Sequence, residues 1–157
     1  MASKICVLIL ENLRSVENTG SIFRTAEGLG VAKIILVGTT PAPVDRFARK
    51  RADFAKISLG SEDMIDWEYS KEIKAILKDL KAQNFQIIAL EQSEKSQNLK
   101  DFQPKHQFAL VVGNEVDGVS KEALEIVDAV VEIPMQGKKE SLNVSVSTGI
   151  ALYELLQ

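Results

Sequence analysis

Short apolar runs alternate with amphipathic stretches along the whole chain. A strand that is covered on both faces of a sheet reads as a nearly continuous apolar run, so these runs predict buried strands. The expected strands lie at residues 4–10, 33–37, 85–90, 108–112 and 130–133. Between residues 45 and 69 the pattern indicates one short helix and one short strand without fixing their limits.

The amphipathic stretches predict helices with recognisable ends. In residues 71–83, apolar residues recur at positions i, i+3, i+4 and i+7, which places them on one helical face. The predicted helices and their N-caps lie at residues 19–29 (Asn18), 71–83 (Ser70) and 120–127 (Ser120). Gly30 and Asn84 are expected to end the first two, because both residue types accept the left-handed conformation.

The alternation of strands and helices predicts one α/β domain over residues 1–157. Its sheet is expected to be mostly parallel, with helices on both faces and no accessory RNA-binding domain. Ligands of such sheets bind beyond the carboxyl ends of the strands. The loops after residues 90, 113 and 133 are therefore where a site is expected.

The last predicted helix, at about residues 143–156, is apolar on nearly every side and begins with Ser141 or Asn143 as its cap. A helix of this kind must be buried on several faces. We therefore expect a homodimer with this helix at the interface. The alternative is that the helix fills the centre of a monomer's core.

The overall charge of the chain is mildly acidic. The net charge is −3, with 26% charged and 45% hydrophobic residues, and nucleic-acid-binding surfaces are usually basic. One segment, residues 45–56, is nevertheless basic. Its candidates for contact with RNA phosphates are Arg46, Arg49, Lys50 and Arg51. The same residues also fit the solvated face of a helix, and both interpretations stay open.

Several kinds of chemistry lack the residues they need. The chain has one cysteine and one histidine, so no internal disulfide, metal site or Ser-His-Asp or Cys-His nucleophile is expected. Cys6 is expected to be a buried thiol, and His106 an exposed loop residue. No apolar run approaches the ~20 residues of a membrane span, and the first residues do not read as a signal peptide. We expect a cytoplasmic protein without membrane contact.

Three polar loops remain as candidates for a site. The first runs from Asn18 to Arg24 at the start of a helix, where Gly20 is expected to leave open space beside the guanidinium. It suits an anionic partner and equally fits an ordinary exposed arginine. The second, residues 113–118, and the third, residues 133–143, each follow a strand. Taken singly, they fit a plain strand-to-helix turn and a capped turn.

Taken together and in this order, the three loops are specific. They read N-x-G-x-x-x-R from Asn18, G-N-E-x-x-G from Gly113, and I-P-M followed by S-L-N from Ile133. This combination resembles the three motifs of the SpoU (TrmH-like) family of the SPOUT superfamily, whose members are RNA ribose 2′-O-methyltransferases. The resemblance extends from the first predicted strand to the last predicted helix.

The resemblance implies a deep C-terminal trefoil knot, which is a rare exception among folds, and a dimer packed through the first and last helices. It implies tRNA or rRNA as the substrate. It also implies S-adenosylmethionine as the methyl donor, bent in the knot and held largely by backbone groups. The matching cofactor-binding positions are Leu90, Gly113, Ile133, Ser141 and Leu142.

The catalytic positions implied by the resemblance are Arg24, Asn18, Glu115, Ser141 and Asn143. Arg24 matches the family's proposed general base. A guanidinium stays protonated at neutral pH, however, so binding of the adjacent phosphate or stabilisation of the developing alkoxide is an alternative. Asn18 is expected to orient Arg24 or the ribose, and Glu115 to pair with Arg24 or to contact the substrate.

Three other functions also stay open. The first is a catalytically inactive module that binds RNA or the cofactor. The second is a related SPOUT enzyme that methylates a base nitrogen. The third is a flavodoxin-like nucleotide binder, which predicts neither a knot nor dependence on a dimer.

Overall fold

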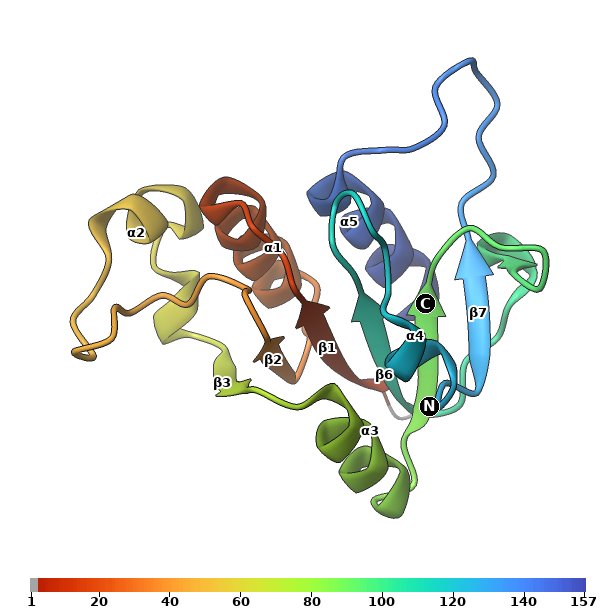
Figure 1. Ribbon diagram of the computed structural model, residues 1–157, viewed down its shortest axis with the longest axis horizontal. Helices are drawn as coiled ribbons and strands as arrows, with labels where there is room; N and C mark the ends of the chain where they lie inside the picture. Colours follow the sequence, from red (N-terminus) through yellow and green to blue (C-terminus); the bar gives the residue numbers. More distant parts are fainter. Residues whose placement is uncertain (1–2) are drawn as a thin grey trace.

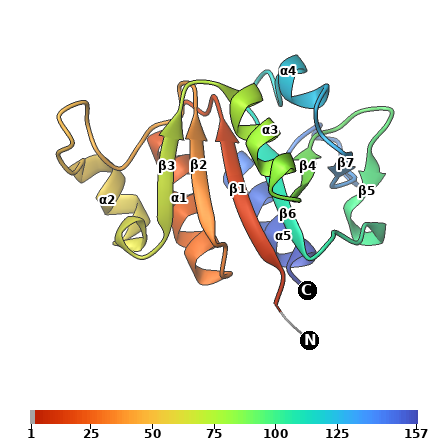
Figure 2. The same cartoon turned by 90° about the horizontal axis from the view of Figure 1, so that it is seen from below.

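A computed structural model describes residues 3–157 as one twisted sheet between two layers of helices (Figures 1 and 2). In chain order the elements are β1 (Ile5–Glu11), α1 (Val16–Gly28), β2 (Lys33–Val37), α2 (Ala52–Ser58), η1 (Ser61–Asp63), β3 (Asp66–Ser70), α3 (Ile73–Ala82), β4 (Gln86–Leu90), β5 (Gln97–Asn98), η2 (Leu99–Asp101), β6 (Gln107–Val112), α4 (Lys121–Leu124), β7 (Ala129–Glu132) and α5 (Val144–Leu155).

The sheet has the strand order β3-β2-β1-β6-β4-β7-β5, and every pairing in it is parallel. This confirms the α/β class and the parallel sheet. The five apolar runs are strands within one residue of their predicted limits, and α2 and β3 are the helix and strand expected between residues 45 and 69. β5 was not predicted, because it is a pair of exposed polar residues at the sheet edge.

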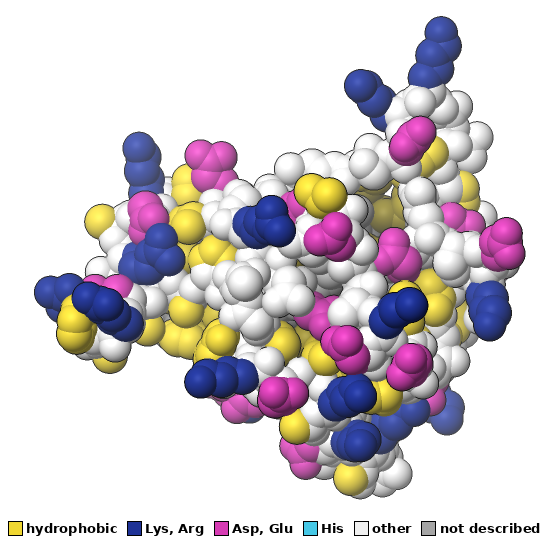
Figure 3. Space-filling model, viewed as in Figure 1, with side chains coloured by type: hydrophobic (Ala, Val, Ile, Leu, Met, Phe, Trp, Pro, Cys, Tyr) yellow, Lys and Arg dark blue, Asp and Glu magenta, His cyan; other side chains and the backbone are white. Residues whose placement is uncertain are grey.

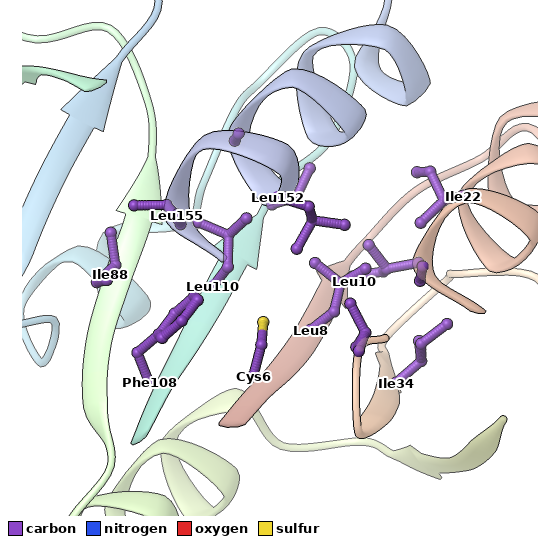
Figure 4. Close-up of a cluster of buried hydrophobic side chains, with 14 of the residues drawn as sticks. Cys6, Leu8, Leu10, Ile22, Ile34, Ile88, Phe108, Leu110, Leu152 and Leu155 are labelled. Atoms are coloured by element: carbon purple, nitrogen blue, oxygen red, sulfur yellow. The ribbon is translucent and has the colours of Figure 1, made fainter. Parts of the chain in front are cut away.

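The two faces of the sheet carry separate cores, because successive side chains of a strand point to opposite sides. On one face Cys6, Leu8 and Leu10 of β1 pack with α1 and α5, and Figure 4 shows the side chains of this cluster meeting between the helices and the strands. On the other face Val7 and Ile9 pack with α3 and α4. β1 is therefore buried on both sides, as its continuous apolar run predicts.

The start of α1 differs from the prediction. Ser15 is the N-cap, and its hydroxyl accepts a hydrogen bond from the Asn18 backbone N–H at 3.0 Å. The prediction of Asn18 as the cap was wrong, because Ser15 is an equally good capping residue one turn earlier. Asn18 lies inside the first turn, and its side chain is free to face the carboxyl edge of the sheet.

Most of the other predicted helix ends are confirmed, but α4 ends at Leu124, three residues before the predicted limit at residue 127. Ser120 and Asn143 cap α4 and α5, and Asn84 has a φ of 68° after α3. The assignment of Ser70 as a helix cap was wrong. Its hydroxyl accepts from the Glu72 backbone N–H instead, and α3 begins without a side-chain cap.

α5 packs on the same face of the sheet as α1 and lies beside that helix (Figure 1). Its inner face, which includes Ala151, Leu152 and Leu155, is fully buried. Its outer face exposes Val146, Ile150 and Tyr153 by 51%, 42% and 60%. A central position in a monomer's core is therefore excluded, and one apolar face of this helix stays uncovered in the single chain. No helix within residues 3–157 is long and apolar enough to cross a membrane.

Candidate cofactor pocket at the carboxyl edge of the sheet

A cavity of about 630 Å³ opens where β4, β6 and β7 end. Its walls are the three loops that follow these strands, together with the first turns of α1 and α5. Figure 3 shows acidic side chains around this recess, below the projecting loop 134–142. Cavities of roughly 300–1,000 Å³ are typical of small-molecule sites. The lining residues include Glu91, Glu115, Asp117, Glu132 and Glu140, and within residues 3–157 no Lys or Arg lines the cavity.

The structure brings most of the predicted site residues together in this cavity. All five predicted cofactor positions line it: Leu90, Gly113, Ile133, Ser141 and Leu142. Among the predicted catalytic residues, Asn18, Glu115 and Asn143 line it together with Ser141. Arg24 does not, although it belongs to the same group of motifs.

The loop after β6 is a tight turn whose glycines are required by the protein itself. Asn114 and Gly118 exchange backbone hydrogen bonds of 3.1 and 2.9 Å. A Cβ at Gly113 would lie 2.3 Å from the Gly118 carbonyl, and Gly118 has a φ of +73°. Glycine is therefore required at both positions for the loop to close on itself.

Asn114 organises the same loop and was not singled out from the sequence. Its Oδ1 accepts hydrogen bonds from the backbone N–H groups of Val116 and Asp117, at 2.8 and 3.0 Å. Its Nδ2 donates to the carbonyl oxygen of Asn12, beyond the end of β1, at 2.7 Å. This side chain thus ties the β6 loop to the neighbouring strand.

Two glutamates outside the predicted site hold the rim of the pocket. Glu11, which is 2% exposed, accepts hydrogen bonds from the Ser120 backbone N–H at 2.9 Å and from its hydroxyl at 2.6 Å. Glu91 accepts from the Val119 backbone N–H at 2.6 Å. A carboxylate at the end of a buried strand was the available sequence signal, since such a group needs donors nearby.

Asn18 and Asn143 join the first and third motifs. Asn143 Oδ1 accepts from the backbone N–H groups of Ser145 and Val146, which directs its Nδ2 toward Asn18. That Nδ2 donates to Asn18 Oδ1 at 3.1 Å. The Asn18 amide is thereby oriented, and its own Nδ2 donates to no group within residues 3–157. A fixed hydrogen-bond donor therefore faces the cavity.

Glu115 supports the start of α1 and does not pair with Arg24. Its carboxylate accepts from the backbone N–H groups of Arg14 and Ser15, both at 3.3 Å. Across the described part of the chain Glu115 forms no ion pair. The suggested Glu115–Arg24 pair is therefore absent, because the carboxylate lies at the helix N-terminus, which attracts negative charge.

Arg24 is exposed on the outer side of α1, and within residues 3–157 its side chain makes no hydrogen bond or ion pair. Gly20, one turn earlier, does not give it open space. A Cβ at Gly20 would lie 2.9 Å from the Ile57 Cβ of α2, so this glycine permits close packing of two helices. The expectation of open space beside Arg24 was wrong.

The four basic candidates lie in the loop before α2, with Arg51 at its N-cap, and not on the face of a helix. Arg49 pairs with Asp45, Lys50 with Asp63, and Arg51 with Asp53. The Arg49 backbone N–H is the main cause that lowers the pKa of Asp45, and the hydrogen bond to Asp63 raises the pKa of Lys50. Arg46 pairs with no carboxylate among residues 3–157, and no Arg or Lys of this loop lines the large cavity.

Cys6 and His106 are where the sequence places them. Burial raises the pKa of the Cys6 thiol far above its ordinary value, so this group is not a nucleophile. His106 is exposed before β6. Residues 3–157 contain no cluster of three or more potential metal-ligating side chains.

Comparison with known proteins gives a consistent result. The model of the SpoU rRNA Methylase family matches residues 5–153. A 23S rRNA (guanosine-2′-O-)-methyltransferase of Xanthomonas axonopodis pv. citri is 33% identical over 156 residues, which are 99% of this chain and 60% of the relative. A tRNA (guanosine(18)-2′-O)-methyltransferase of Aquifex aeolicus is also 33% identical, over 96% of this chain and 68% of the relative.

Solved structures agree with the sequence comparisons. The AdoMet-bound rRNA methyltransferase from Sinorhizobium meliloti superimposes with a TM-score of 0.87 and 27% identity, over 98% of this chain and 56% of that one. The TrmH/SpoU tRNA modifying enzyme of A. aeolicus has a TM-score of 0.83 and 34% identity, over 96% and 73%. This chain therefore spans a little more than half to about three quarters of the length of these four proteins.

Proposed function

Because this chain belongs to the SpoU rRNA Methylase family, we propose that it transfers a methyl group from S-adenosylmethionine to a ribose 2′-hydroxyl of tRNA or rRNA. The observation that carries the proposal is the single cavity into which the loops after β4, β6 and β7 bring the predicted cofactor residues. The names of the two relatives, one acting on rRNA and one on tRNA, support this substrate class.

The cavity fits S-adenosylmethionine in size and charge. Leu90, Ile133 and Leu142 offer apolar contact for a purine, while the loop backbone offers hydrogen bonds. The acidic lining suits a ligand that carries a sulfonium and an ammonium group. It does not suit a phosphate, so S-adenosylmethionine fits this cavity better than a nucleotide does.

The chemistry needs positioning more than an activated side chain. Bound S-adenosylmethionine supplies a methyl group on a positively charged sulfur, which is electrophilic without a metal. The 2′-oxygen would gain this methyl as the methyl–sulfur bond breaks and would release its proton to a base or to water, so the chain's residues have to orient the ribose and stabilise the charge on its oxygen. Asn18 Nδ2, fixed by Asn143, orients the ribose. Ser141, with Asn143, shapes the third wall.

Arg24 acts on the RNA, either as the base or by binding the adjacent phosphate or the developing alkoxide. The second role is favoured, because a guanidinium is a cation with five N–H donors and no free acceptor for a proton. Arg24 lies six residues after Asn18, which is about 9 Å further along α1 and about 120° around it. It is thus turned away from the cavity of its own chain.

In a homodimer, Arg24 could reach the cavity of the other subunit although it is turned away from its own. The uncovered face of α5, formed by Val146, Ile150 and Tyr153, lies beside α1. The N-terminal turn of α5 lines the cavity. A two-fold interface through both helices would place the outer side of the partner's α1 against this turn. We therefore propose that Arg24 serves the cavity of the partner subunit.

The C-terminal knot and the place of action belong to the same proposal. The chain leaves β7 near one edge of the sheet and returns to pack α5 over β1 and β6 at its middle. Family membership supports passage of this returning segment through a preceding loop, as a trefoil knot. A cytoplasmic location fits a substrate that is tRNA or rRNA.

The test is incubation with total cellular RNA and S-adenosylmethionine labelled in its methyl group, followed by mass spectrometry of the digested RNA. We expect label in a 2′-O-methylnucleoside, and Arg24→Ala should abolish it while calorimetry still shows cofactor binding. Label on a base nitrogen would identify the other SPOUT chemistry. Cofactor binding without transfer to any RNA would identify an inactive binding module.

A further inference from the structure

A turn far from the cavity presents an exposed aromatic ring with two arginines beside it. Phe47 is 62% exposed at the tip of the loop between β2 and α2. The guanidinium carbons of Arg46 and Arg49 lie 4.8 and 5.0 Å from its ring centroid. Figure 1 draws this loop at the left end of the molecule, and Figure 3 shows Lys and Arg side chains around a hydrophobic one there.

Hydrogen bonds hold this turn in one shape. The Asp45 backbone N–H donates to the Arg49 carbonyl oxygen at 2.9 Å, and the Asp45 carboxylate accepts from the backbone N–H groups of Phe47 and Arg49 at 2.8 and 3.0 Å. Ala48 adopts a φ of 60° at the bend. The ring is thus presented on an ordered turn, which lowers the entropic cost of binding through it.

Of the four basic candidates before α2, only Arg46 and Arg49 lie beside the ring, and both are at least partly available to bind a phosphate. Lys50 and Arg51 point to carboxylates outside the turn, Asp63 and Asp53, at 2.8 Å. Arg49 shares Asp45, while Arg46 pairs with no carboxylate among the described residues. A phosphate beside the ring would therefore meet one free and one partly neutralised guanidinium.

We propose that Phe47 stacks on an unpaired nucleobase of the RNA substrate, while Arg46 and Arg49 bind the phosphates beside it. Aromatic rings and guanidinium planes are the groups that hold splayed-out bases. The acidic lining of the cavity repels the RNA backbone, so basic contacts outside it should add to the affinity for RNA. The inference rests on the proposed function, because that function supplies RNA as the ligand.

The experiment measures binding of a fluorescently labelled 12-nucleotide single-stranded RNA of mixed sequence by anisotropy. Phe47→Ala should weaken binding about 5- to 150-fold, the loss expected for one stacked base. Phe47→Trp should retain affinity, because the indole also stacks. Arg46→Gln should weaken binding and reduce its salt dependence by about one phosphate contact. Met64→Ala is the matched control, since Met64 is 72% exposed outside the turn.

A duplex RNA of the same length separates stacking from charge. Its base faces are covered, so Phe47→Ala should leave duplex binding nearly unchanged. Equal losses on both RNAs, or a single-stranded affinity within two-fold of wild type, would overturn the inference. A change in sedimenting mass on Phe47→Ala would also overturn it, because the ring would then contact a second copy. Normal methyl transfer with an unchanged KM for RNA in Phe47→Ala would remove this inference and leave the proposed function standing.

Discussion

Asn143 uses the two atoms of its side-chain amide for different purposes. Its Oδ1 caps α5, and its Nδ2 orients Asn18 at the cavity. One side chain thus provides the acceptor for the helix end and the donor for Asn18. Aspartate is as good a cap, but its carboxylate has no hydrogen to donate to the side-chain carbonyl oxygen of Asn18.

Substitution of Asn143 separates the two purposes. Asn143→Asp keeps the cap and loses the donor, so its free energy of unfolding should stay within about 0.5 kcal/mol of wild type while turnover falls. Asn143→Ala should lose about 1 kcal/mol of stability as well. Urea unfolding and a methyl-transfer assay measure the two effects. An aspartate variant with wild-type turnover would show that Asn18 needs no orientation.

Residue identities at the site were largely predictable, but their partners were not. Asn18 and Asn143 stand out by motif, yet their hydrogen bond joins positions 125 residues apart. Glu115 stands out in the same way, and its position at the N-terminus of α1 depends on a contact across about a hundred residues. Gly20 was misjudged because its close neighbour belongs to another helix, which periodicity within α1 cannot reveal.

At the scale of elements, hydrophobic pattern predicts strands better than helix ends. A strand that is buried on both faces appears in the sequence as a continuous apolar run, and the two ends of the run mark the two ends of the strand. The first residue of a helix depends on which of several nearby capping residues forms the cap, and in α1 the cap is Ser15 and not Asn18. The strand order and the meeting of three loops in one cavity follow from packing between distant elements.

The hydrogen bonds between Glu11 of β1 and Ser120, the N-cap of α4, are one such contact between distant elements, and their contribution to the free energy of unfolding can be measured. Glu11 is 2% exposed, and its carboxylate accepts hydrogen bonds from both the backbone N–H and the hydroxyl of Ser120. Glu11→Ala would leave a partly buried backbone N–H without an acceptor, which costs about 1–3 kcal/mol. Urea unfolding should show this loss, whereas Glu27→Ala, at an exposed position of α1, should change stability by less than about 0.5 kcal/mol. Equal effects of the two substitutions would remove the structural role of Glu11.

At the scale of the whole molecule, the outer face of α5 is the feature that one chain leaves incomplete. Val146, Ile150 and Tyr153 recur at helical spacing on this face. The sequence reveals the all-round apolar helix, but only the fold shows which side its own core covers.

Charge on this face should separate the subunits. Ile150→Glu is expected to halve the sedimenting mass, because a buried unpaired carboxylate costs several kcal/mol at an interface. Methyl transfer should fall with it, since the proposed active site needs both chains. Met64→Glu, a similarly exposed apolar position away from α5, should change neither property. A wild-type protein that sediments as a monomer would contradict the expected dimer directly.

Mixed dimers test which cavity Arg24 serves. One subunit carries Arg24→Ala; the other carries Gly118→Val, whose side chain would meet the Glu91 carboxylate at a φ of +73° and is expected to abolish cofactor binding. Each variant alone should be inactive.

If Arg24 serves the partner, every mixed dimer keeps one complete site, formed by the intact cavity of one chain and the arginine of the other. Random mixing should then restore about a quarter of wild-type activity, because half of the dimers are mixed and each has one site. If Arg24 served its own cavity, no combination would contain a complete site, and mixing would restore nothing.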